Sequence, residues 1–194
     1  MTKPVTSVAI MMLVEEGRIA LDDPLSKHLP EFSGVEVFRE ESAGKLSTEP
    51  AEREPTIRDL LRHTSGLTYG FFSNTPVDRL YLKQNLLTDY SIPLSAMTAR
   101  LAKIPLLYQP GSRFNYSISS DVLGRVVEVA SGKSLAEFFD SRISKPLDLR
   151  DTGFFVPEAS HDRVAANYST KSERLTMIDG STGSPYQKHR NLYS

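Results

Sequence analysis

Cysteine is absent from this sequence of 194 residues. Disulfides, thiolate nucleophiles and thiolate metal sites are therefore excluded for these residues. Histidine is scarce as well, and the four histidines show no pair at the i, i+4 spacing of a helical metal site: His28, His63, His161 and His189. We therefore expect neither a metal nor a cofactor.

Excess charge is also missing, because 23 Lys and Arg residues nearly balance 24 Asp and Glu residues. No basic tract alternates with aromatic residues, so nothing in the sequence predicts a nucleic-acid partner. No apolar run approaches the length of a membrane span, so no membrane segment is expected in this chain. A hydrophobic fraction of 39% and a charged fraction of 24% are typical of a globular fold.

Apolar residues near the amino end recur at helical spacing, at Val5, Val8, Ala9, Met12 and Leu13. They predict a helix over residues 4–16 that begins at or upstream of Met1, with Pro4 tolerated in its first turn. Lys3 would then share a helix face with the residue three positions earlier. A serine there would lie beside the Lys3 ammonium, and a buried lysine can accept a serine proton. The alternative is an ordinary exposed lysine near the chain start.

Further helices are predicted from apolar spacing, caps and turn residues over 56–61, 76–87, 94–104, 121–130 and 135–143. The pattern weakens between residues 32 and 55, where only Val35, Val37 and Phe38 favour a short strand. The charged segment 39–54 reads as a solvated, mobile loop. The sequence therefore predicts a mostly α-helical chain with few short strands.

Two short motifs have plain structural interpretations. Gly132-Lys133-Ser134 resembles the end of a phosphate loop, but position 127, where such a loop needs glycine, is valine. It therefore predicts a junction between two helices. His63, Thr64 and Ser65 put an imidazole beside hydroxyls in sequence, and a cap at a helix end is the favoured interpretation.

The first residues, Met1-Thr2-Lys3-Pro4-Val5-Thr6, resemble the end of the Ser-x-x-Lys motif of serine β-lactamases and penicillin-binding proteins. In this resemblance the serine falls one residue before Met1. Later segments follow in the order of the class C β-lactamase-like branch, and they are residues 16–24, 60–67, 110–117, 145–149 and 152–154. The resemblance covers about residues 1–160 and is specific because the pieces keep their order.

This resemblance implies an α+β fold of the β-lactamase/transpeptidase type for the parent domain. The chain would be a partial domain, with a helical lobe over 1–160 whose nucleophile helix lacks its serine. Residues 161–194 would form a poorly defined polar tail, with no separate second domain. The late Lys-Thr-Gly or His-x-Gly strand motif of the family is not found.

The resemblance also assigns roles to residues. Lys3 matches the lysine that helps to activate the serine, and Tyr116 matches the tyrosine of the Tyr-x-Asn motif, which shares the acid and base duties. The non-catalytic alternative for Tyr116 is a buried structural tyrosine. Ile118 stands where the motif has asparagine, which favours esterase, transesterase or peptidase members over penicillin hydrolysis. Tyr69 and Phe71 are the candidate substrate-binding residues.

The expected parent function is hydrolysis of small-molecule esters or amides through an acyl-serine intermediate, as in carboxylesterases, β-lactamases or D-amino-acid peptidases. Without the serine the chain itself would be inactive. If Met1 is instead a genuine start, the chain would be a ligand-binding or regulatory remnant whose pocket, with Tyr69 and Phe71, binds without turnover. A purely structural helical domain is the third alternative.

Overall fold

The computed structural model describes residues 2–86, 92–170, 175–180 and 184. Helices predominate, and the mostly helical chain with few short strands is confirmed. The helices are α1 (Thr2–Glu15), α2 (Ile57–Leu61), α3 (Pro76–Lys83), α4 (Leu94–Leu101), α5 (Ser119–Ser131) and α6 (Leu135–Phe139). The strands are β1 (Glu36–Ser42), β2 (Lys45–Pro50), β3 (Asn167–Ser169) and β4 (Thr176–Asp179).

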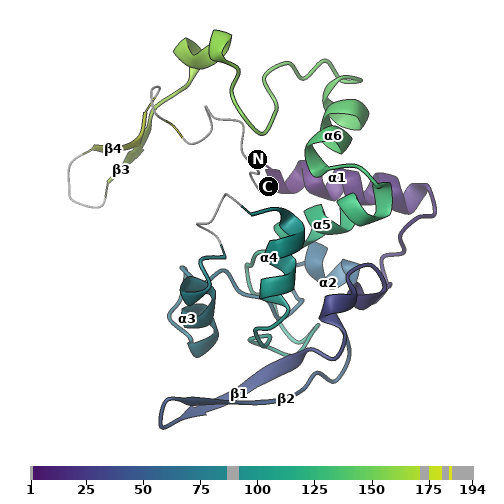
Figure 1. The fold of residues 1–194 in the computed structure, drawn as a ribbon, viewed down its shortest axis with the longest axis vertical. Coiled ribbons are helices and arrows are strands. Elements are labelled where there is room, and N and C mark those ends of the chain that lie inside the picture. Colours follow the sequence, from purple (N-terminus) through teal and green to yellow (C-terminus); the bar gives the residue numbers. More distant parts are fainter. Residues whose placement is uncertain (1, 87–91, 171–174, 181–183, 185–194) are drawn as a thin grey trace.

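Helix α5 is the centre of the packing, because it contacts α1, α2, α4 and α6 (Figure 1). Its Val122, Val126 and Val127 are fully buried. At Gly124 an added Cβ would lie 2.9 Å from Cδ2 of Leu135, so a larger residue there would require the Leu135 side chain to move. Burial of these apolar side chains supplies the main stabilising free energy of the helical part.

The helix ends follow the predicted signals with shifts of a few residues. Thr56 caps α2 through a capping box with Asp59, as its sequence pattern predicted. The same Thr-x-x-Asp pattern recurs at α3, where Thr75 and Asp78 form a second capping box. The Gly132-Lys133-Ser134 motif is a helix junction, since Gly132 ends α5 in the left-handed conformation. Met1 and residue 87, at ends of predicted helices, lie outside the described residues.

The prediction of a loop over residues 39–54 is wrong up to residue 50, because two strands occupy most of that part, whereas residues 51–54 lie outside strands and helices. β1 and β2 pair antiparallel from Glu36↔Pro50 to Ser42↔Lys45. Ala43 and Gly44 both have positive φ, as a two-residue hairpin turn requires. The hairpin extends away from the helices (Figure 1), so only Val37 of its two strands is buried. Apolar alternation, the signal for a half-buried strand, is therefore absent.

The carboxyl-terminal part contains β3 and β4, which pair antiparallel with each other. This small sheet lies inside the segment that the sequence assigned to a polar tail. The division into a lobe over 1–160 and a tail over 161–194 stays a prediction. Among the described residues, no helix combines the length and the apolar character that crossing a bilayer requires.

Candidate active site

Lys3 in the first turn of α1 lies against Tyr116, which stands just before α5. The Lys3 Nζ atom is 4.8 Å from the ring centroid of Tyr116 and 5.8 Å from that of Tyr69. The fold thus brings together the two residues to which the resemblance assigned catalytic roles. An ammonium over an aromatic ring is attracted by about 0.5–2 kcal/mol.

Tyr116 belongs to a cluster of rings that we call the aromatic wall, formed by Tyr69, Phe71, Phe72 and Tyr116. Tyr69 stacks on Tyr116 with ring centroids 5.4 Å apart, and Phe72 meets Tyr116 at 5.5 Å. Phe71 lies 4.7 Å from Tyr69 and 4.5 Å from Phe72. Phe71 is 57% exposed and Phe72 is 66% exposed, so the wall offers apolar ring surface to a ligand.

Backbone and side-chain hydrogen bonds fix the segment that carries Tyr116. Asn115 donates its side-chain amide to the carbonyl oxygen of Leu67 at 2.8 Å. Its backbone N–H donates to the carbonyl oxygen of His63 at 2.8 Å, and Ile118 N–H donates to that of Thr68 at 3.2 Å. Residues 115–118 therefore run beside residues 63–68. Tyr116 itself is 38% exposed, which does not fit the alternative of a buried structural tyrosine.

His63 is the member of this cluster that the sequence interpretation missed. Its ring centroid lies 4.9 Å from that of Tyr116, and its Nδ1 atom lies 3.2 Å from both the backbone nitrogen and the Oγ of Ser117. Burial lowers the pKa of His63, and the nearby positive charge of Lys3 lowers it further. A neutral imidazole beside Lys3 leaves the ammonium as the local positive charge.

The hydroxyl beside this imidazole comes from a distant segment, and the sequence neighbours of His63 point elsewhere. Thr64 donates its hydroxyl to Asp59 at 3.0 Å. Ser65 bonds through its hydroxyl to Ser119 at 3.1 Å, and Ser119 bonds to Ser117 at 2.7 Å. His63 also ends α2 with φ of 55°, in keeping with the helix-end interpretation of this motif. A sequence signal for the pairing of His63 with Ser117 was available, because residues 60–67 and 110–117 both belong to the family resemblance.

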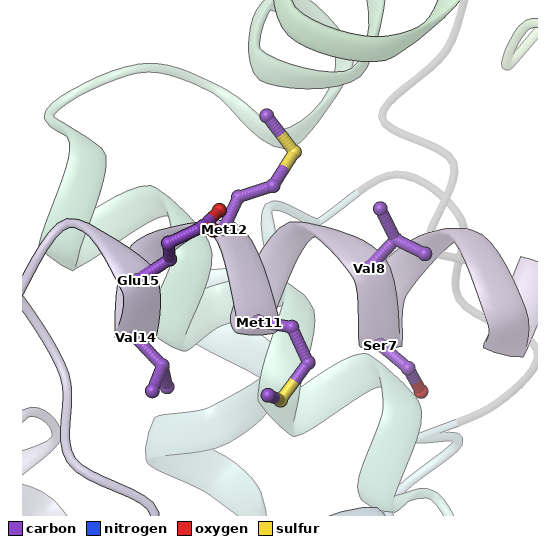
Figure 2. Close-up of a pocket in the computed structure, with 6 residues that line it drawn as sticks. All are labelled: Ser7, Val8, Met11, Met12, Val14 and Glu15. Carbon is purple, nitrogen blue, oxygen red and sulfur yellow. The ribbon is translucent and has the colours of Figure 1, made fainter.

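A separate hollow of about 500 Å³ lies along α1 and is lined by Ser7, Val8, Met11, Met12, Val14 and Glu15 (Figure 2). Its lining is mainly apolar, and Glu15 is its one ionisable side chain. The hollow therefore lacks the paired acid and base that acyl transfer needs, and we assign the candidate site to the cluster around Lys3. No group of three His, Cys, Asp or Glu residues suited to a metal occurs in the described part of the chain.

Comparisons with known proteins show the family of the chain. The profile of the Beta-lactamase family matches residues 1–194. Protein Rv1367c of Mycobacterium tuberculosis is 42% identical over 169 residues, which are 87% of this chain and 41% of that protein. Esterase EstB of Burkholderia gladioli is 38% identical over 183 residues, covering 92% of this chain and 43% of EstB.

Among solved structures, EstCE1, described as a hydrolase with promiscuous acyltransferase activity, superimposes with a TM-score of 0.72. It is 33% identical, over 91% of this chain and 43% of EstCE1. The chain thus spans less than half the length of each of these three relatives. The match along the whole chain shows that this protein belongs to the Beta-lactamase family.

Proposed function

We propose that Lys3 and Tyr116 are the acid–base pair of an acyl-transfer site, and that the whole protein hydrolyses small-molecule esters through an acyl-serine. The observation that carries the proposal is the 4.8 Å separation between Lys3 Nζ and the Tyr116 ring. The names of EstB and EstCE1, an esterase and a hydrolase, support the same reaction class.

The proposed reaction uses a serine three residues before Lys3, on the same face of α1. Tyr116, beside the Lys3 ammonium, accepts the serine proton while Oγ attacks the ester carbonyl carbon, and backbone N–H groups bind the oxyanion. The alcohol leaves with a proton returned by the same pair. Water then attacks the acyl-serine and its proton passes to the pair. The bond between the acyl carbon and Oγ breaks, the pair returns that proton to Oγ, and the acid is released.

The aromatic wall is the proposed contact for the apolar part of the substrate, with Tyr69 and Phe71 as the substrate-binding residues. The Tyr69 ring stands beside Lys3 and Tyr116, and Phe71, which contacts Tyr69, is largely exposed. Ile118 is buried where the family motif has an asparagine amide. An apolar wall and a missing amide favour neutral esters over β-lactams as substrates.

The test is hydrolysis of p-nitrophenyl acetate and butyrate by a polypeptide that includes the serine before Met1 and the rest of the domain. Lys3→Ala and Tyr116→Phe should each lower kcat about 10²- to 10⁴-fold. Lys45→Ala on the hairpin and Tyr168→Phe on β3 are matched controls that should keep full activity. Absence of hydrolysis, or hydrolysis that survives Lys3→Ala and Tyr116→Phe, would reject the proposal.

A non-catalytic ligand-binding or regulatory protein is the second candidate, favoured by the exposed rings of Phe71 and Phe72. It predicts saturable binding of an aromatic ester without turnover. A fluorophosphonate probe separates the two candidates, because it labels an activated serine covalently and leaves a binding protein unlabelled.

A further inference from the structure

A buried carboxylate lies directly behind the aromatic wall. Asp78 in the first turn of α3 is 0% exposed, yet no basic side chain bonds to it among the described contacts. All its recorded hydrogen-bond donors belong to residues 68–75, the segment that carries Tyr69, Phe71 and Phe72. We call residues 68–75 the wall loop.

Each carboxylate oxygen of Asp78 accepts hydrogen bonds from a different end of the wall loop. Oδ1 accepts from Thr68 Oγ1 at 2.5 Å and from the Gly70 backbone N–H at 3.1 Å. Oδ2 accepts from Ser73 Oγ at 2.5 Å, and from Thr75 N–H at 3.0 Å and Thr75 Oγ1 at 2.7 Å. The bonds to Thr68 and Gly70 hold the start of the loop, and those to Ser73 and Thr75 hold its end. One side chain therefore ties down both ends of the segment between them.

The charge of Asp78 is maintained by these donors. Burial alone would raise the pKa of the carboxyl, but hydrogen bonds from Ser73, Thr68 and Thr75 outweigh it and keep the pKa below its ordinary value. A carboxylate is acceptor-only, so both of its oxygens can face N–H and O–H donors at once. An amide of the same shape cannot.

The backbone of the wall loop also sits tightly on α3. Gly70 has φ of +85°, and a Cβ added there would lie 2.9 Å from Cβ of Tyr81. The Tyr81 hydroxyl in turn lies 3.4 Å from the backbone nitrogen of Thr68. The loop is thus shaped by the face of α3 on which Asp78 lies.

We propose that Asp78 is a positioning residue that holds the wall loop, and with it Tyr69, Phe71 and Phe72, in the arrangement that receives the apolar group of the substrate. The role of the wall in substrate binding rests on the proposed function. Asp78 touches neither substrate nor reacting atoms. It acts through the rings whose backbone it fixes.

Asp59 provides a matched comparison because it has the same position in the Thr-x-x-Asp cap of α2. It accepts from Thr56 N–H and Thr56 Oγ1, as Asp78 does from Thr75. Its remaining donors are the Arg53 guanidinium and the Thr64 hydroxyl, and neither belongs to the wall loop. Asp59→Asn therefore damages a helix cap without releasing the aromatic rings.

The first measurement is amide hydrogen exchange of the 194-residue chain, which needs neither substrate nor turnover. In Asp78→Asn, whichever way the amide is oriented, its NH₂ group faces either Gly70 N–H or Thr75 N–H. Amides of residues 68–75 should then exchange roughly tenfold faster, while those of 54–58 keep their protection. Asp59→Asn should give the reverse pattern. Unchanged exchange in residues 68–75 of Asp78→Asn would overturn the proposal.

The second measurement is binding of N-benzylbutanamide, a neutral apolar amide, by titration calorimetry. Asp78→Asn should weaken its binding about tenfold, and Asp59→Asn should leave its dissociation constant unchanged even at an equal loss of melting temperature. Ser73→Ala changes an exposed residue and removes one hydrogen-bond donor to Asp78, while the cap of α3 stays intact. It therefore replaces Asp78→Asn as the test variant if Asp78→Asn does not fold. It should weaken binding by a smaller factor.

The outcomes of these experiments distinguish the positioning role of Asp78 from the proposed ester hydrolysis. Unaltered binding in a variant with a released loop, or no binding by the wild-type chain, would overturn the positioning role of Asp78. Failure of ester hydrolysis in the longer polypeptide would instead reject the proposed function. It would leave the exchange and binding results to decide what Asp78 does.

Discussion

Ser117 donates its backbone N–H to Nδ1 of His63 across 3.2 Å, which links the end of α2 to the start of α5. Because Nδ1 accepts this bond, the neutral imidazole carries its proton on Nε2. A protonated imidazole has no lone pair on Nδ1 and would lose the bond. The segment that carries Tyr116 therefore keeps this hydrogen bond to the end of α2 only while His63 is neutral.

Stability should fall in mild acid through His63. Burial and the charge of Lys3 put the folded-state pKa below the ordinary 6.5, so between these two values the unfolded chain binds more protons. The contribution of His63 is therefore fully present above pH 6.5 and is lost as the pH falls through the folded-state pKa.

Urea unfolding at about pH 7.5 and about pH 5.5 measures this loss, because carboxylates titrate mainly below that range. His63→Asn is the control variant, since asparagine tolerates the positive φ of this position and does not titrate. Its free energy of unfolding should fall less than that of the wild type over the same range. Equal losses in both proteins would contradict the assignment.

Removal of the Lys3 charge should raise the pKa of His63. In Lys3→Met the repulsion between the two cations disappears, while the burial of the imidazole remains. An NMR titration of the His63 ring protons should show a pKa higher than in the wild type but still below 6.5. Lys45→Met on the exposed hairpin should leave the pKa of His63 unchanged. This measurement tests the contact geometry without any substrate.

Gly66→Ala should destabilise the protein severely. Gly66 has φ of +86°, and an added Cβ would lie 2.1 Å from the carbonyl oxygen of Tyr108. Strain and collision together should cost at least about 2 kcal/mol of the free energy of unfolding. Gly34→Ala is the control, because Gly34 also has positive φ but no atom lies within 4 Å of its added Cβ. Chemical denaturation of both variants should show the smaller loss for Gly34→Ala.

The apolar hollow on α1 should make the isolated chain associate. Val8 is 49% exposed and Met11 is 46% exposed, and both line that hollow (Figure 2). Met11→Lys should increase the monomer fraction in sedimentation experiments, because a charged group opposes burial of this surface. Val129→Lys, at an exposed valine outside the hollow, should have little effect. A sharp, cooperative melt of the unsubstituted chain as a monomer would contradict this expectation.

Much of the helical architecture could be predicted from local sequence. Apolar spacing and caps located α1, α4 and α5 to within a few residues, and the Thr56 capping box formed as expected. The β1–β2 hairpin could not be found in this way. Its strands bury only Val37, so its stability comes from backbone pairing and from bonds between its base and Leu106, which leave no apolar period in the sequence.

In the candidate site too, some features could be predicted from the sequence and others depend on the tertiary structure. The sequence by itself determined which residue types are present, the helical position of Lys3 and the family resemblance that pointed to Tyr116. The tertiary structure alone placed Lys3 over the ring of Tyr116, set His63 against Ser117 and gathered the wall loop around Asp78. The contacts of Lys3 with Tyr116 and of His63 with Ser117 join segments far apart along the chain, and the packing of α5 against α1 and α2 brings them together. Spacing along a sequence carries no information about such distances.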